Sequence, residues 1–429
     1  MNRPLAQCIV EALCVSGSSE DCLARLGSFG LGDWQRTLPW LDDSGLALYL
    51  LERISHSEFH NAFPVRIEAR LRRNLASNQQ RVAEMKREFA SLNLGLEAAG
   101  VEYAVLKGFA LAPDYCPDAA LRTQYDYDYL VHPKSVKIAQ QTLRAAGYSQ
   151  KIKSPGFQPA GESLFANQPL SLPLPDHDFY SVNIPRAVEL HVSLWQTERD
   201  MIGLEAPEDA LDRKRTGSWD SLRFPVLAED DGLIFQSLHA FQHLLSYWCR
   251  PSWFLEIAHF MAKRRSDEAF WEQFRSRVNN RRCLPEIVAL VFSMAETLFG
   301  APVPAQVRIW LAASLPSALS LWVRRYGRKC ALAGFPGSKL TLFVHREFIH
   351  DPAIWKKVQR GRLLPFHRPA HVTEPGNPSL TSHWKASWDQ WRFVLRRFQF
   401  HLGALLRYAW ELPRWKRILS SFHPSQRDD

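Results

Sequence analysis

Two aspartates stand two residues apart in a short segment that is rich in aromatic and aliphatic side chains. They are Asp126 and Asp128, within the stretch RTQYDYDYLV at residues 122–131. Such neighbours favour a strand, in which residues i and i+2 share one face and lie roughly 6 to 7 Å apart. Carboxylates at this spacing can hold one divalent cation, or two cations about 4 Å apart. The simpler alternative is a solvated edge strand with two surface acids.

A third acid lies in a second segment with the alternation of a strand, AVELHV at residues 187–192. Glu189 and His191 fall on one face of this segment and the aliphatic residues on the other. Burying an acid there is costly unless it is paired or bound to a metal. If the two strands are neighbours in register, Asp126, Asp128 and Glu189 meet over one face of the sheet. We therefore predict that these acids are catalytic and hold Mg²⁺ or Mn²⁺, as in two-metal phosphoryl transfer, with Glu189 also a candidate base.

Other side chains near the acids are candidates for holding a triphosphate. Lys107-Gly108 follows an apolar segment. A glycine there lets the backbone approach a phosphate, and the start of a helix favours negative charge. The alternative is an ordinary strand-to-helix glycine beside a solvated lysine. Arg122 either clamps phosphate or neutralises the acids, and His191 is predicted to orient an acid or to contact phosphate from outside the metal's ligand set.

The elements that must position these residues are predicted from periodicity. Strands are expected at 101–106, 125–131, 177–182 and 187–192, the last two joined by a turn, with a loop or flap at 151–176. Strand and helix alternate in this region, which indicates an α/β unit. The expected domains are an N-terminal helical region at 1–99, a catalytic core at 100–200, a helical domain at 201–323 and a basic, Trp-rich helical tail at 324–429.

Composition limits the classes of function. The 429 residues are 46% hydrophobic and 23% charged, as in an ordinary soluble globular protein, and the net charge of +9 favours an anionic partner. Seven cysteines without a Cys-x-x-Cys pair argue against a structural zinc or a disulfide scaffold. The N-terminus lacks the pattern of a signal peptide, and no apolar run reaches the ~20 residues of a membrane span. A cytoplasmic protein without a transmembrane segment is expected.

Five motifs follow one another within roughly residues 70–260: VLKGFAL at 105–111, Leu121-Arg122, DYDYLV at 126–131, AGY at 146–148 and VELH at 188–191. In this order they resemble the uncharacterised nucleotidyltransferase family of the DNA polymerase β-like superfamily. The resemblance implies an α+β fold, in which the minimal nucleotidyltransferase mixed sheet carries helices on one side and is flanked here by helical regions at both ends. It also implies metal-dependent transfer of a nucleoside monophosphate from an NTP, with ATP favoured, to an acceptor with release of pyrophosphate.

The chain departs from the family pattern at two points. Tyr125 stands where the family usually has glycine, so that its ring either crowds the nucleotide or stacks on the base. Lys107-Gly108 replaces the Gly-Ser turn of the superfamily. The acceptor is left open between a small molecule, a protein side chain and an RNA end. Two alternatives are a non-catalytic member of the fold that binds nucleic acid or protein, and a toxin–antitoxin or defence component.

Two further patterns lie outside these motifs. His239 and His243 have the spacing of a helical zinc pair but lack a third ligand, so core or capping roles are expected, and Glu256 is expected to be solvated or salt-bridged. The tail contains a basic amphipathic helix whose apolar stripe is predicted to pack against the core. Binding of single-stranded nucleic acid and contact with an anionic membrane surface are the alternatives. The stripe consists of Trp384, Trp388, Trp391, Leu395, Phe398, Leu402 and Leu405.

Overall fold

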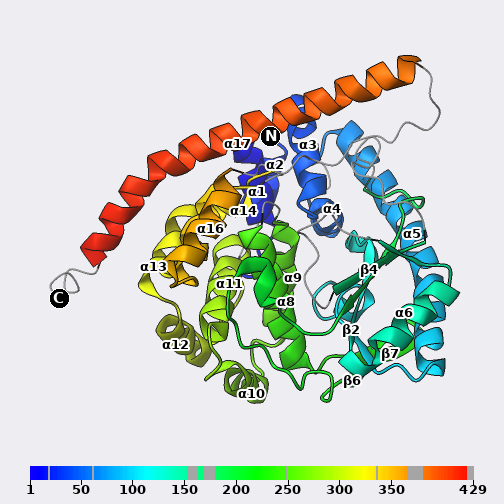
Figure 1. Ribbon diagram of the computed structural model, residues 1–429. Helices are drawn as coiled ribbons and strands as arrows, with labels where there is room; N and C mark the ends of the chain where they lie inside the picture. Colours follow the sequence, from blue (N-terminus) through cyan, green and yellow to red (C-terminus); the bar gives the residue numbers. More distant parts are fainter. Residues whose placement is uncertain are drawn as a thin grey trace.

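A seven-stranded mixed sheet lies beside a large body of helices in the computed structural model (Figure 1). The structure describes residues 1–17, 20–59, 62–151, 162–167, 179–246, 249–334, 337–364 and 380–422. Across the sheet the strands run in the order β3-β4-β5-β2-β1-β7-β6. Their bounds are β1 Tyr103–Val105, β2 Asp126–Val131, β3 Ser149–Lys151, β4 Glu162–Ala166, β5 Ala187–His191, β6 Arg215–Trp219 and β7 Leu222–Val226.

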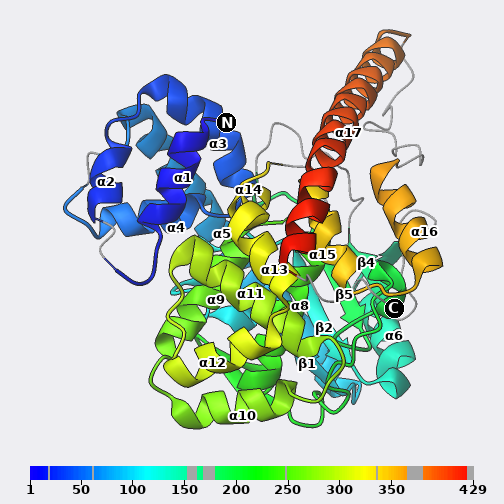
Figure 2. The same cartoon turned by 90° about the vertical axis from the view of Figure 1, so that its left-hand side faces the viewer.

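Helices precede, interrupt and follow the sheet along the chain, so the predicted α+β class is confirmed. The helix α11 is almost entirely apolar and packs against α8 and α9 in the middle of the helical body (Figure 2). All seven cysteines are free thiols. The α-helices are α1 Arg3–Ala12, α2 Glu20–Leu26, α3 Leu31–Asp43, α4 Ala47–Ser55, α5 Val65–Ala98, α6 Val136–Ala145, α7 Thr197–Asp200, α8 Glu229–Leu245, α9 Pro251–Lys263, α10 Glu268–Val278, α11 Leu284–Phe299, α12 Ala305–Ser314, α13 Ser317–Trp322, α14 Arg328–Ala331, α15 Leu342–Glu347, α16 Pro352–Leu363 and α17 Leu380–Phe422.

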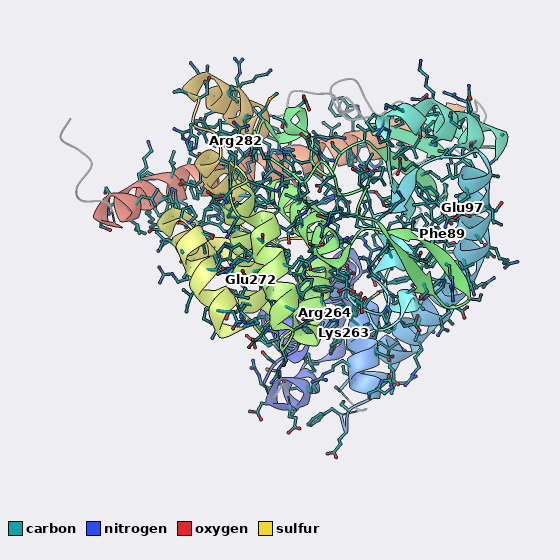
Figure 3. All side chains as sticks on the ribbon, turned by 90° about the horizontal axis from the view of Figure 1, so that it is seen from below. Phe89, Glu97, Lys263, Arg264, Glu272 and Arg282 are labelled. Carbon is teal, nitrogen blue, oxygen red and sulfur yellow. The ribbon has the colours of Figure 1, made fainter. Side chains whose placement is uncertain are left out.

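The strand β2 lies at the centre of the sheet, antiparallel to β1 and parallel to β5. Asp128 of β2 pairs in register with Glu189 of β5, so the two strands are neighbours, as the prediction of a shared site assumed. The tyrosines of β2 point to the opposite face. There the rings of Tyr127 and Tyr129 stack on Phe89 of α5, with centroids 6.0 and 6.4 Å from the centroid of Phe89. Figure 3 labels Phe89 on this helix. This packing determines which face of β2 carries the acids, because side chains alternate along a strand.

Two expectations about the sheet are wrong. Residues 179–182 form turns and a short irregular stretch instead of a strand, and residues 177–178 lie outside the described part. The segment 151–176, expected to be a loop, contains β4, which pairs antiparallel with β5. The sequence pattern does not predict β4, because its five residues lie between stretches that are rich in Pro, Gly and Ser. The sheet also continues beyond residue 200, through β7 beside β1 and β6 at the edge.

The helix α8 holds the end of β1 in place. The side-chain amide of Gln236 on α8 donates a hydrogen bond to the carbonyl of Leu106 at 3.0 Å. The N–H of Leu106 in turn donates to the backbone carbonyl of Asp128 at 2.9 Å. Both bonds act on the residue immediately before Lys107. The backbone at Lys107 is therefore anchored to α8 on one side and to β2 on the other.

The helix α17 runs along the outside of the molecule (Figures 1 and 2). The predicted packing of its apolar stripe against the core is wrong for most of the described stripe, because the stripe residues within 388–398 are more than half exposed. The side chain of Trp384 lies outside the described part. The helix is held instead by Tyr408 and Trp415, which both stack on Phe343. Within the described ranges, no helix combines the length and the apolar character that a membrane span needs.

Candidate active site

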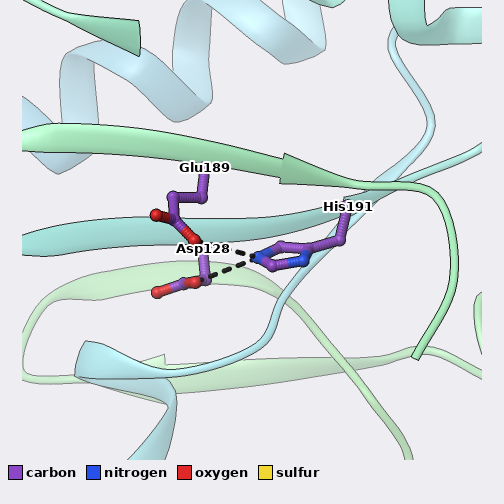
Figure 4. Close-up of side chains that lie close together, drawn as sticks. All are labelled: Asp128, Glu189 and His191. Carbon is purple, nitrogen blue, oxygen red and sulfur yellow. Dashed lines mark hydrogen bonds and ion pairs between the residues drawn. The ribbon is translucent and has the colours of Figure 1, made fainter. Parts of the chain in front are cut away.

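Neighbouring strands bring three potential metal ligands together on one face of the sheet. Asp128 of β2 lies opposite Glu189 of β5, and His191 lies two residues further along β5 (Figure 4). One ligand atom of each residue lies within 4.8 Å of the others. His191 Nε2 is 3.1 Å from Asp128 Oδ1 and 3.8 Å from Glu189 Oε2. The register of two parallel strands produces this arrangement, since residues two apart on a strand share a face.

The ammonium of Lys107 lies between the two aspartates of β2. Its Nζ is 3.0 Å from Asp128 Oδ1 and 3.8 Å from Asp126 Oδ2, and the side chain is 11% exposed. Burial acts to lower the pKa of this ammonium, but the carboxylates of Asp126, Asp128 and Glu189 outweigh burial and raise the pKa above its ordinary value. Lys107 is therefore charged at neutral pH and neutralises part of the negative charge of the site.

Asp126 stands at the exposed side of the site, where its side chain is 34% exposed. It lines the same cavity as Glu189 and His191, but it is not one of the three residues whose ligand atoms lie within 4.8 Å. Its role as a metal ligand stays a prediction. His191, predicted to act from outside the ligand set, offers a nitrogen within that group. The sequence signal for His191 is the Glu-x-His spacing, which places both side chains on one face.

The donor atoms fit a hard divalent cation. Asp128 Oδ2 is buried and has no hydrogen-bond partner among the described residues. A buried polar atom without a partner costs roughly 1–3 kcal/mol, and more when it is charged. A cation at this position would offset that cost. Carboxylate oxygens suit Mg²⁺ and Mn²⁺, and an imidazole nitrogen also suits softer divalent metals. Asp128, Glu189 and His191 are the residues whose ligand atoms lie close enough together for such an ion.

A cavity of about 220 Å³ opens beside these residues. Pockets that enclose drug-sized ligands have roughly 300–1,000 Å³, so a nucleotide bound here would extend outside the cavity. The site face of the sheet, the segment 193–199 and α8 form the walls. The lining residues are Lys107, Asp126, Glu189, His191, Ser193, Leu194, Trp195, Gln196, Arg199, Phe235, Leu238, His239, Gln242 and His243.

Several residues of the cavity wall were not predicted to lie at the site. His239 and His243 of α8 are half-buried in the wall, with ring centroids 4.6 Å apart. Burial, together with the positive charge of Lys107, holds the pKa of His239 well below its ordinary value, so that its ring is neutral at pH 7. Gln196 is buried in the wall, and both its amide atoms lack a hydrogen-bond partner among the described residues. The i, i+4 spacing singles out the two histidines in the sequence, whereas no sequence pattern indicates Gln196.

The backbone at Gly108 requires glycine. Its φ is 67°, in the left-handed region, and a Cβ there would come within 2.9 Å of Gln124 Oε1. Gly108 begins η1 (Gly108–Leu111), a 3₁₀ helix of four residues. A helix start therefore follows Lys107 as predicted, although it is a single short turn. Contact between this turn and a triphosphate stays a prediction.

Arg122 is paired with an acid of α9. Its Nε is 3.1 Å from Glu256 Oε1, which also accepts a hydrogen bond from the hydroxyl of Tyr49 at 3.1 Å. The side chains of Arg122 and Glu256 are 11% and 3% exposed. The expectation that Glu256 is salt-bridged is confirmed. A contact between Arg122 and a triphosphate stays a prediction, because this pairing already engages the Nε of the guanidinium.

We expect Glu256→Gln to reduce the free energy of unfolding by about 3 kcal/mol, because it leaves the buried guanidinium of Arg122 without its counter-charge. Asp114→Asn is the matched control. It breaks a more exposed ion pair with Lys263 and should cost less than about 1 kcal/mol. Chemical denaturation at neutral pH measures both changes. Equal losses in the two variants would contradict a buried Arg122–Glu256 pair.

Tyr125 lies beneath two arginines. The guanidinium carbons of Arg81 and Arg250 are 4.5 and 5.3 Å from the centroid of its ring. Its hydroxyl donates to the carbonyl of Phe179 at 3.2 Å. Tyr125 is not among the residues that line the cavity. Stacking on a base, or crowding of a nucleotide, stays a prediction for this residue.

Comparison with known proteins places the chain in a family. No curated protein and no solved structure matches the chain. A family described as an uncharacterised nucleotidyltransferase matches residues 31–300, which is more than half of the chain and includes the strands, the cavity and the acids described above. The protein therefore belongs to this uncharacterised nucleotidyltransferase family.

Proposed function

We propose that the protein is a metal-dependent nucleotidyltransferase that moves a nucleoside monophosphate from an NTP to an acceptor and releases pyrophosphate. The observation that carries this proposal is the convergence of Asp128, Glu189 and His191 within 4.8 Å, with one oxygen of Asp128 buried and unpaired among the described residues. Membership of the family supports nucleotidyl transfer. The antiparallel pairing of β2 with β1 and its parallel pairing with β5 support the minimal nucleotidyltransferase sheet as the core.

Each residue of the site has a proposed role. Asp126, Asp128 and Glu189 hold Mg²⁺ or Mn²⁺, and such a cation would neutralise charge on the attacking and leaving oxygens of the phosphoryl group. Lys107, now paired with the acids, turns its ammonium to the triphosphate. Glu189 accepts the proton of the acceptor hydroxyl. His191, whose Nε2 is 3.1 Å from Asp128 Oδ1, orients that carboxylate or donates to phosphate.

The proposed substrates are a nucleotide donor and an acceptor. ATP is the proposed donor, and the acceptor is a small molecule, a protein side chain or an RNA end. Among the described residues that line the cavity, Lys107 and Arg199 carry cationic side chains that suit a polyphosphate. Gly108 and Arg122 remain proposed contacts of the same group, and Tyr125 a proposed contact of the base.

A non-catalytic member of the fold is the second candidate. The observation that favours it is the ammonium of Lys107, which already lies 3.0 Å from Asp128 Oδ1, as a bound cation would. In such a protein the lysine would hold the acids permanently and no divalent cation would bind. The two candidates therefore differ in whether the acids bind a cation.

Incubation with each labelled NTP, Mg²⁺ or Mn²⁺ and cell extract tests the proposal. The expected result is transfer of label to an acceptor, dependent on the cation. Thermal unfolding with Mn²⁺ and each NTP separates the two candidates, because the enzyme should gain stability from the cation whereas the non-catalytic protein should not. Absence of label transfer, together with an unfolding temperature that the cation leaves unchanged, would reject the enzymatic function.

A further inference from the structure

The apolar stripe on the outside of α17 is not used by the proposed active site. Its members are three or four residues apart and are each 44% to 70% exposed. This spacing places them along one side of the helix. A contiguous exposed apolar patch on a soluble protein marks an interaction site. The outer stripe is defined here as Trp388, Trp391, Leu395, Phe398, Leu402 and Leu406.

The outer stripe faces away from the body of the protein. Tyr408 and Trp415 on the inner side of α17 are buried and stack on Phe343, each with ring centroids 5.2 Å apart. Leu406 and Tyr408 are two residues apart, which is about 200° around a helix. Figure 2 shows the N-terminal part of α17 standing clear of the labelled helices and strands. In the described part of the chain, the outer stripe is therefore left to solvent or to a partner.

The charge on α17 is strongly biased toward the positive sign. Residues 380–422 contain eight Lys and Arg and two acidic residues. One of the acids, Glu411, is turned toward the body, where it accepts a hydrogen bond from the hydroxyl of Tyr326 at 2.9 Å. Arg392, Arg396 and Arg407 are exposed, and each directly follows a residue of the outer stripe. They lie about 100° around the helix from those residues, so arginines border the stripe.

We propose that α17 lies flat on an anionic membrane surface, with the outer stripe at the boundary between headgroups and acyl chains. A helix with Trp, Phe and Leu on one side and arginines beside them has the chemistry of an interfacial helix. Single-stranded nucleic acid explains the stripe less well, because Leu395, Leu402 and Leu406 have no ring on which a base can stack. A second copy of α17 docked on the stripe would bring two rows of arginines together, which is repulsive.

Sedimentation with phospholipid vesicles tests this proposal without reference to nucleotidyl transfer. The full-length protein should pellet with vesicles of phosphatidylcholine and phosphatidylglycerol, and much less with phosphatidylcholine alone. The double variant Trp391→Asp/Phe398→Asp should bind at least about tenfold more weakly, because it replaces two aromatic rings that would insert into the bilayer with charged side chains. Each of Arg392→Gln and Arg396→Gln should weaken binding by on the order of fivefold, and added salt should do the same.

Val65→Asp/Ile309→Asp is the matched control for the double variant. Val65 on α5 and Ile309 on α12 are 83% and 74% exposed, so this variant adds the same charge at exposed apolar positions outside α17, and vesicle binding should not change. Failure of the wild type to pellet with the anionic vesicles would overturn the proposal, as would equal binding by the double variant. Stripe-dependent dimerisation in analytical ultracentrifugation, or stripe-dependent binding of a single-stranded oligonucleotide in place of vesicles, would also overturn it.

Discussion

Asp128→Asn is expected to slow nucleotidyl transfer by on the order of a thousandfold. Asp128 lies at the centre of the site, in contact with Lys107 and His191 and opposite Glu189. Asparagine keeps the volume of the side chain but removes the charge that a divalent cation requires. The initial rate of label transfer at saturating Mg²⁺ measures the effect. The stabilisation that Mn²⁺ gives to the wild type should be lost in the same variant.

Asp220→Asn is the control for this change. Asp220 is 63% exposed, pairs with Lys86 and is not one of the residues that line the cavity, so neither transfer nor stabilisation by the cation should change. A cooperative unfolding transition of Asp128→Asn separates loss of the site from loss of the fold. A folded Asp128→Asn protein that transfers label at the rate of the wild type would contradict the proposed metal site.

Lys107→Met should strengthen cation binding while it slows transfer. Without the ammonium, Asp126 and Asp128 repel each other, and in the absence of a divalent cation the free energy of unfolding should fall by about 3 kcal/mol. Mn²⁺ should restore much of this loss, because it no longer competes with the lysine. Transfer should fall by about a hundredfold, because the triphosphate loses a cationic contact. Thermal unfolding over a titration of Mn²⁺ and single-turnover rates measure the two effects.

Lys214→Met is the control for removal of the lysine charge. Lys214 pairs with Glu102 at 2.7 Å in a partly exposed position, so the change should leave both the response to Mn²⁺ and the transfer rate intact. A response to Mn²⁺ that is no larger in Lys107→Met than in the wild type would show that the lysine and the cation do not share a position. Asp128→Asn is therefore expected to weaken cation binding, and Lys107→Met is expected to strengthen it.

The sequence predicts those features of the site that depend on the alternation of side chains between the two faces of a strand. Asp126 and Asp128, like Glu189 and His191, can be assigned to strand faces because the period of a strand is two residues. Only the adjacency of the two strands had to be assumed, and the pairing of β2 with β5 confirms it. Much of the helical domain expected at 201–323 follows in the same way from a local period, and α8 to α13 lie within it, although β6 and β7 occupy part of residues 215–226.

The remaining features depend on segments far apart in the chain. Arg122 and its partner Glu256 are 134 residues apart, and no local pattern indicates that they meet. The cavity wall on α8 is likewise distant in sequence from the acids, so the positions of His239 and His243 could not be derived. The amphipathic pattern of α17 indicates that its stripe requires an apolar partner, but not whether that partner belongs to the same chain.

The hydrogen-bonded register of β2 and β5 also limits how the gene can change in length. Additions to the connection between residues 132 and 186 that spare β3 and β4 leave Asp128 facing Glu189. Loss of one codon within β5 would instead place Val188 or Leu190 opposite Asp128 and exchange a carboxylate for a hydrocarbon. Active homologues should therefore differ freely in the span between the two motifs, while indels inside either motif should accompany inactive copies.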